Sequence, residues 1–196
     1  MKNFDPKYNA IPKTEIHIHL EGAIRTQTII DIAKEYNLKL PAYDVSELDK
    51  HVKVYDQMRD LQAVLDAFDI FQRTITSPAV FERISWELFE DCAKQNIKLF
   101  EVRFSPDWAF HGHNLDWDAC LEGLLRAKVR AEKEFDMAIG IIAITSRGMG
   151  AAMAALQGLS GLGLLPCIAG QINSADFEHL LCKAGTVNPE RAAASP

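Results

Sequence analysis

The sequence predicts an α/β fold in which parallel strands alternate with helices. Between residue 14 and about residue 145, short apolar segments alternate with longer amphipathic ones, as in βα units around a parallel sheet. One early segment places two histidines at alternate positions and continues at once into Leu-Glu-Gly and a helical pattern. A later segment, Met137–Thr145, is almost entirely apolar, which is typical of a strand buried on both faces. These observations predict three strands.

The first predicted strand is Thr14–Leu20. Successive side chains of a strand point to opposite faces, so His17 and His19 share one face while the neighbouring aliphatic residues share the other. Two adjacent imidazoles suggest a metal site, although such a pair can also form a half-buried polar face. The position at the end of a strand favours the metal, because parallel barrels build their active sites there.

Several helices are expected between the first strand and the second. Thr26–Tyr36 has apolar residues at three- and four-residue spacing and a threonine available as N-cap. A second apolar stripe and a third are separated by a break at Ser77-Pro78. The second stripe is Leu61, Val64, Leu65, Phe68, Phe71 and Ile75, and the third is Phe81, Ile84, Leu88 and Cys92.

The second strand is predicted at Ile97–Pro106, with Phe100, Val102 and Phe104 on one face. Charged residues are expected on the inner faces of the first two strands, namely Glu15 on the first and Glu101 and Arg103 on the second. We expect them to form a structural ion pair inside the fold, and a contact to substrate is the alternative. Asp116 is expected to cap a further helix, which leads into the third strand at Met137–Thr145. The residues of that helix's apolar stripe are Leu121, Leu124, Leu125 and Lys128 with its aliphatic stem.

Composition narrows the possible functions. The chain has 196 residues, of which 48% are hydrophobic and 24% are charged, as in an ordinary globular domain. A net charge of −6 argues against nucleic acid or an anionic membrane as partner and favours a small-molecule substrate. The N-terminal residues resemble no signal peptide, so we expect a cytoplasmic protein. The four widely spaced cysteines are expected to be reduced, buried thiols.

The character of the sequence changes after Arg147. No charged residue occurs from Gly148 to Ala175, and the segment is rich in Ala, Gly and Leu. A transmembrane helix is one interpretation, but Gln157 and Pro166 interrupt the run. A phosphate loop is poorly supported, since no Lys-Ser/Thr follows the glycines. We expect residues 1–150 to form one structural unit and residues 151–196 to be an atypical tail, produced by a frameshift or a truncation.

Three ordered segments together resemble the adenosine deaminase family of the amidohydrolase superfamily. The family's first-strand motif, Lys-x-Glu-x-His-x-His-Leu-Asp/Glu-Gly followed by a small and an aliphatic residue, is matched from Lys13 to Ile24. "FEVRFSP" at residues 100–106 and "IAITSRGMG" at residues 142–150 resemble the second- and third-strand signatures. The resemblance covers roughly residues 8–150. It implies an incomplete (β/α)8 TIM-type barrel with about three of its eight strands present.

The resemblance also implies a zinc hydrolase that deaminates adenosine, and often 2′-deoxyadenosine, in purine salvage. His17 and His19 would be zinc ligands, and His19, Glu21 and Gly22 would contact the nucleoside, with Glu21 facing the ribose hydroxyls. Taken alone, Glu21 could equally be a carboxylate favoured by a helix N-terminus, and Gly22 could serve only the turn. Many adenosine deaminases have Asp where this chain has Glu, and Glu is frequent in adenine and aminodeoxyfutalosine deaminases.

The family's remaining site residues have no counterpart beyond residue 150. The segment lacks His-Ala-Gly-Glu, His-Gly and Asp-Asp, and His179 has the wrong neighbours. His111 and His113 form a second H-x-H in an expected loop, and His51 is expected at the surface. No catalytic residue is therefore identifiable, and we expect little deaminase activity and poor solubility. The alternative is a non-catalytic binding or assembly module that pairs its open sheet edge with a second chain.

Overall fold

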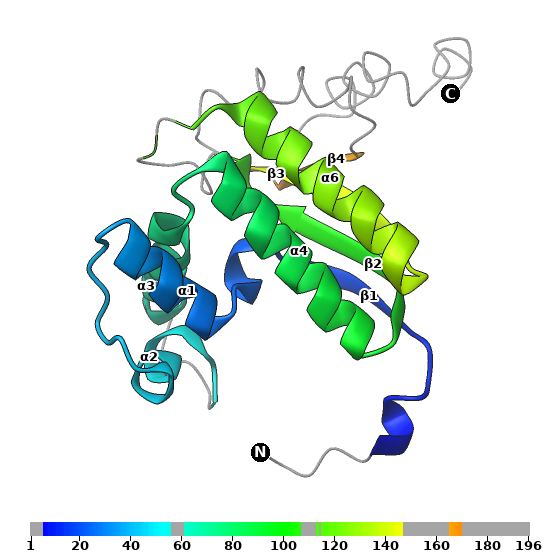
Figure 1. The fold of residues 1–196 in the computed structure, drawn as a ribbon, viewed down its shortest axis with the longest axis horizontal. Coiled ribbons are helices and arrows are strands. Elements are labelled where there is room, and N and C mark those ends of the chain that lie inside the picture. The colour runs from blue at the N-terminus through cyan, green and yellow to red at the C-terminus, as the bar shows by residue number, and fades with distance from the viewer. Residues whose placement is uncertain (1–5, 56–60, 107–112, 114, 147–164, 170–196) are drawn as a thin grey trace, which may run out of the picture.

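The computed structural model describes residues 6–55, 61–106, 113, 115–146 and 165–169. Its centre is a parallel sheet of four strands in the order β1-β2-β3-β4 (Figure 1). The strands are β1 (Lys13–His19), β2 (Ile97–Phe104), β3 (Ala138–Ser146) and β4 (Leu165–Ala169). Spatial order follows sequence order, so each described strand pairs with the next one along the chain.

The helices form two groups around this sheet. In Figure 1, α4 and α6 lie side by side across one face of the sheet, and α1, α2 and α3 cluster together beside it. A short 3-10 turn, η2, leads from β1 into α1. The bounds are η1 (Pro6–Tyr8), η2 (Glu21–Ala23), α1 (Thr26–Glu35), α2 (Val45–Val52), α3 (Leu61–Thr74), α4 (Pro78–Lys94) and α6 (Trp117–Phe135).

The predicted α/β class is confirmed, but the strand count is not. The first three strands lie where the sequence pattern placed them, whereas no strand was expected after residue 146. β4 nevertheless joins the sheet, with Ile142 of β3 opposite Leu165. The Ala/Gly-rich composition around β4 concealed it, because that composition shows neither strand nor helix periodicity. The division of the chain at residue 150 stays a prediction.

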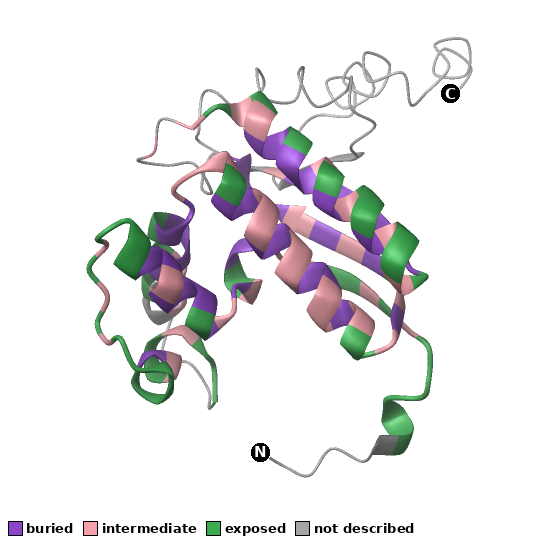
Figure 2. Cartoon of the chain, viewed as in Figure 1, coloured by how far each residue is buried: buried purple, intermediate pink, exposed green. Residues whose placement is uncertain are grey.

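Side-chain alternation along β2 builds the core, as predicted. Phe100, Val102 and Phe104 are each 0% exposed and face α4 and α6, whose buried sides are turned toward the sheet (Figure 2). The ring of Phe104 meets that of Phe81 on α4 at a centroid distance of 5.4 Å. On the other face of β2, Leu99 is 48% exposed. One face of the sheet therefore packs on helices, while part of the other is open in the described residues.

Of the two helix caps that the sequence predicted, one forms and one does not, and Ser77 caps a further helix. The hydroxyl of Ser77 accepts from the Val80 amide at the start of α4, and Asp116 accepts from Ala119 at the start of α6. The prediction that a threonine caps α1 is wrong. Its N-cap is Arg25, which makes no side-chain cap bond, and the Thr26 hydroxyl donates instead to Asp49 on α2. A tertiary contact has replaced the local one.

Arg25 ties the first helical group to the second. Its guanidinium donates to Asp91, at 2.8 Å from Nε, and also to Glu90, both on α4. These hydrogen bonds raise the pKa of Arg25, with Asp91 as the largest cause. The pair of carboxylates on α4 thus fixes the direction in which the chain leaves the first strand, which in turn positions η2.

Gly123 lies where α6 packs tightly against α4. A Cβ at this position would lie 3.1 Å from the Cβ of Glu82 and 3.4 Å from the carbonyl oxygen of Pro78. We expect Gly123→Val to lower the free energy of unfolding by about 1–3 kcal/mol, because the branched side chain must push the helices apart. Urea denaturation measures the change. Glu122→Val, on the exposed side of the same turn, is the control, and equal losses from both variants would contradict a tight contact at Gly123.

Two of the four cysteines lie in the described core. Cys92 and Cys120 are buried and form no disulfide, as predicted for reduced thiols. Burial raises the pKa of the Cys92 thiol to about 12 and that of Cys120 to about 11. The side chains of Cys167 and Cys182 lie outside the described residues. Among the helices that the structure describes, none has the length and apolar character needed to cross a membrane.

Candidate active site

The site begins with an irregularity in the pairing of β1. Glu15 lies opposite Phe100, and the next regular pairs are Ile18 with Val102 and His19 with Arg103, so β1 has one extra residue between them. Such a bulge changes which face the following side chains occupy. Glu15 therefore shares the helix-covered side with Phe100, and its charge contributes to the raised pKa of Cys92 on α4. The prediction that Glu15 lies on the inner face is wrong.

His17 lies within this irregular interval and His19 just after it, and the two rings lie side by side, as predicted. Their ring centroids are 5.7 Å apart, with an angle of 43° between the planes. His19 is half-buried, and its ring meets the edge of Phe68 on α3 at 6.1 Å. Burial lowers the pKa of His19, and the neighbouring charges of His17 and Arg103 lower it further. His19 is thus held as neutral imidazole, which is the form that ligates metals.

Glu21 links the ends of the first two strands. It begins η2, is only 3% exposed, and its Oε1 accepts a hydrogen bond of 2.8 Å from the backbone amide of Ser105, just beyond β2. Its other oxygen, Oε2, is buried and has no hydrogen-bond partner among the described residues. Burial raises the pKa of Glu21 to about 7. Oε1 of Glu21 therefore links η2 to the end of β2, and Oε2 is available to bond a further partner.

A cavity of about 200 Å³ opens beside these residues. It is bounded by the ends of the first three strands and by one face of α3, so its floor is polar and its wall is mainly apolar. In parallel α/β barrels, the active site lies at the carboxyl ends of the strands. The lining residues are His19, Glu21, Val64, Leu65, Phe68, Gln72, Ser105 and Ile144.

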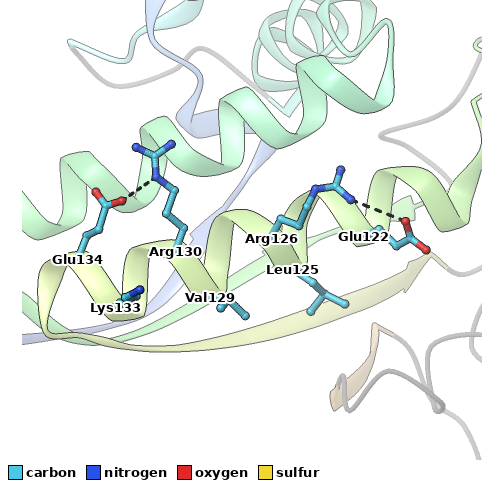
Figure 3. Close-up of a pocket in the computed structure, with 7 residues that line it drawn as sticks. All are labelled: Glu122, Leu125, Arg126, Val129, Arg130, Lys133 and Glu134. Carbon is cyan, nitrogen blue, oxygen red and sulfur yellow. Dashed lines mark hydrogen bonds and ion pairs between the residues drawn. The ribbon is translucent and has the colours of Figure 1, made fainter.

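A larger hollow, of about 640 Å³, lies elsewhere and has a different character. Figure 3 shows that its residues all come from α6, with the ion pair of Arg130 and Glu134 along the helix. The guanidinium of Arg130 also lies 3.7 Å from the ring centroid of Trp86 on α4. Four of its charged groups form ion pairs with one another, and the sequence assigned no function to any residue of this hollow. The smaller cavity at His19 and Glu21 is therefore the candidate site.

Gly22 allows α3 to approach the end of the first strand closely. A Cβ at Gly22 would lie 3.3 Å from Cζ of Phe68, tighter than an ordinary contact. Phe68 in turn touches His19 and lines the cavity. The glycine is thus explained by packing against the cavity wall, whether or not it also touches a ligand.

The remaining charged and histidine predictions have mixed outcomes. The expected ion pair of Glu15, Glu101 and Arg103 does not form in the described structure, where Arg103 donates instead to the carbonyl of Ile16 at 2.9 Å. His51 is exposed on α2, as predicted, and His113 is half-buried. Positions 111 and 179, the other two histidines considered, fall outside the described residues. Among the histidines that the structure describes, His19 lines the candidate cavity and His17 lies beside it on β1.

The donor set fits part of a zinc site. His17 and His19 present two imidazoles from one strand, a common arrangement for zinc ligands. Within the described ranges, no group of three or more His, Cys, Asp or Glu side chains is placed to hold a metal ion. Two imidazole side chains are therefore in place, and completion of the site requires ligands from outside the described residues.

Sequence reasoning missed Gln72 as a site residue. It lies on the face of α3 that carries Val64, Leu65 and Phe68, and it lines the same cavity. A signal was available in the sequence, because Gln72 is four positions after Phe68 and is thus a polar residue in an otherwise apolar stripe.

Comparisons with known proteins identify the family of this chain. The adenosine deaminase family model matches residues 12–160. A curated relative, the adenosine deaminase of Shewanella woodyi, is 36% identical over 130 residues, which are 66% of this chain and 39% of that protein. The chain thus spans about two fifths of the length of such relatives.

Solved structures show the same fold at low sequence identity. An adenine deaminase from Arthrobacter aurescens matches 90% of this chain and 55% of its own with a TM-score of 0.73 and 22% identity. An amidohydrolase from Burkholderia ambifaria with bound Zn matches 95% of this chain and 50% of its own, with a TM-score of 0.67 and 17% identity. Since the family model covers most of the sequence, this chain belongs to the adenosine deaminase family.

Proposed function

We propose that this chain forms the first part of a zinc-dependent site that hydrolyses adenosine and 2′-deoxyadenosine to inosine or deoxyinosine and ammonia. The observation that carries the proposal is the placement of His19 and Glu21 around one cavity, with His17 beside them on the same strand. Family membership supports the same chemistry. Cytoplasmic purine salvage is the setting that we propose for it.

Each residue has a role that follows from its environment. His17 and His19 would hold the zinc ion, which when bound supplies a water of lowered pKa for attack on a purine carbon. Glu21 offers its free oxygen to a ribose hydroxyl while its other oxygen stays bonded to Ser105. The apolar wall of α3, with Phe68 against His19, excludes water and packs on the purine ring.

We infer that this chain by itself turns over substrate poorly. The first-strand ligands are present, but the sequence has no counterpart of the family's proton-transfer glutamate or later zinc ligands. Without a group that can protonate the ring nitrogen, the chain can bind the substrate but cannot catalyse its hydrolysis efficiently. The chain is therefore expected to bind zinc and nucleoside with little hydrolysis.

Two alternatives keep specific support. Another aminopurine substrate, adenine or aminodeoxyfutalosine, is favoured by Glu21 in place of Asp, and the Arthrobacter aurescens enzyme of similar fold is an adenine deaminase. A non-catalytic assembly module is favoured by β1, which pairs on one side only within the described sheet.

The test supplies the missing half of the site from a relative. Residues 12–146 of this chain replace the matching segment of the Shewanella woodyi adenosine deaminase, and ammonia release is followed with adenosine and with adenine. We expect zinc-dependent turnover of adenosine, lowered at least about tenfold by Glu21→Gln because one hydrogen bond to substrate is weakened.

Three results of this test would change the conclusion. Preferential turnover of adenine would select the other aminopurine. A folded, zinc-loaded chimera without activity toward either compound would refute the deaminase proposal. A stable dimer of the unmodified chain that binds no purine would favour the assembly module instead.

A further inference from the structure

Gln72 is a buried polar side chain in the apolar wall of the cavity. It lies in the last turn of α3 and is 9% exposed, with its amide nitrogen Nε2 fully covered. Within the described part of the chain, that nitrogen has no hydrogen-bond partner. Since more than nine tenths of buried polar groups in proteins are bonded, an unbonded amide at a cavity wall points to a missing partner.

Thr74 on the same helix is a buried polar residue whose donor does have a hydrogen-bond partner. Thr74 is 0% exposed, and its hydroxyl donates to the carbonyl of Ile70 at 2.8 Å, one turn back along α3. The backbone of α3 thus satisfies a buried donor two positions away. Gln72 has a longer side chain that lines the cavity instead, where it meets the same space as Glu21.

Glu21 offers the complementary group in that space. Its Oε2 is buried and also unbonded among the described residues, and the two side chains do not bond to each other. A ligand atom that bonds to both groups must accept from the amide and pair with the carboxyl group. A hydroxyl does both, because it has one proton and two lone pairs. A ring nitrogen has no proton to donate, and an amino group conjugated to a ring accepts poorly.

We propose that Gln72 donates a hydrogen bond from Nε2 to a hydroxyl group of the ligand, while that hydroxyl pairs with Oε2 of Glu21. Gln72 is thereby a specificity-determining residue that favours a nucleoside over the free base. The inference rests on the proposed function, since it takes the ligand to be a purine nucleoside. It also gives a physical reason to prefer adenosine over adenine, because the base alone would leave both buried groups unpaired.

The test measures binding, not turnover, on the full zinc-loaded chain. Wild type, Gln72→Met and Thr74→Val are titrated calorimetrically with adenosine and with adenine. We expect Gln72→Met to weaken adenosine binding about tenfold, because one hydrogen bond is lost, and to leave adenine binding unchanged. Thr74→Val, a buried change on the same helix, is expected to leave both affinities unchanged.

Thermal unfolding without ligand gives a second, independent readout. Methionine has nearly the shape of glutamine without its polar atoms, so Gln72→Met is expected to unfold at the same or a higher temperature than wild type. A lower temperature would mean that the amide is bonded within the protein, which overturns the inference.

The outcomes separate this inference from the proposed function. Equal loss of adenosine and adenine binding in Gln72→Met, or no loss of either, overturns the role of Gln72 while the deaminase proposal stands. Failure of wild type to bind either compound contradicts the proposed function, and the inference falls with it. Selective loss of adenosine binding supports both.

Discussion

Zinc affinity is expected to fall by at least about a hundredfold when His17 and His19 are both replaced by alanine, because loss of even a supporting residue of a metal site has an effect of 10–100-fold. The two rings lie 5.7 Å apart on one strand, and burial keeps His19 neutral and ready to bind. Competition with a chromophoric zinc chelator measures the affinity. The alanine variants remove both nitrogen ligands without touching the helix-packed side of the sheet.

His51→Ala is the matched control for this experiment. His51 is exposed on α2, away from the cavity, so its loss is expected to leave zinc affinity unchanged. If His51→Ala weakens zinc binding as much as the double variant does, the metal is bound nonspecifically by surface histidines. If the double variant keeps wild-type affinity, His17 and His19 are not the ligands.

Replacing Phe104 with alanine is expected to lower the free energy of unfolding by about 3–5 kcal/mol, the usual range for a buried aromatic residue. Phe104 is fully buried at the end of β2, with ring contacts to Phe81 on α4 and Trp117 on α6 at 5.4 and 6.0 Å. The truncation leaves a cavity between the sheet and both helices. Guanidinium denaturation followed by far-UV circular dichroism measures the loss.

Leu99→Ala on the same strand is the control for Phe104→Ala. Leu99 lies on the other face and is 48% exposed, so its truncation is expected to change stability by less than about 1 kcal/mol. Similar losses from both variants would show that the open face of β2 is packed in solution. That result would contradict the description of the helix-covered side as the main core.

The sequence predicted what depends on local periodicity. Alternation along β2 separated Phe100, Val102 and Phe104 from the exposed face, and the structure buries all three. The same rule placed His17 and His19 side by side, and their rings are adjacent although His17 lies within the irregular interval of β1. Patterns of this kind are properties of one segment, so they can be predicted without knowledge of the segment's neighbours.

Three of the failures involve a second segment. The face of Glu15 depends on the register of β1 against β2, which a single strand does not specify. The hydroxyl of Thr26 bonds Asp49 on α2, a helix that periodicity did not predict because Leu48 is its only buried residue. The role proposed for Gln72 depends on its position at the same cavity as Glu21, which the sequence alone does not show. Tertiary contacts decide each of these features.

The order of the strands in the sheet has a consequence for how the chain folds. The hydrogen bond from Arg103 to Ile16 spans 87 positions, because helices α1 to α4 lie between β1 and β2 in the sequence. The later strand pairs, β2 with β3 and β3 with β4, close much shorter loops. Loop-closure entropy therefore opposes the first pairing most, and each later strand adds to an edge that is already formed. The histidines of β1 thus reach their final positions only when the longest loop of the described sheet closes, and a nascent chain released before β2 forms lacks the site.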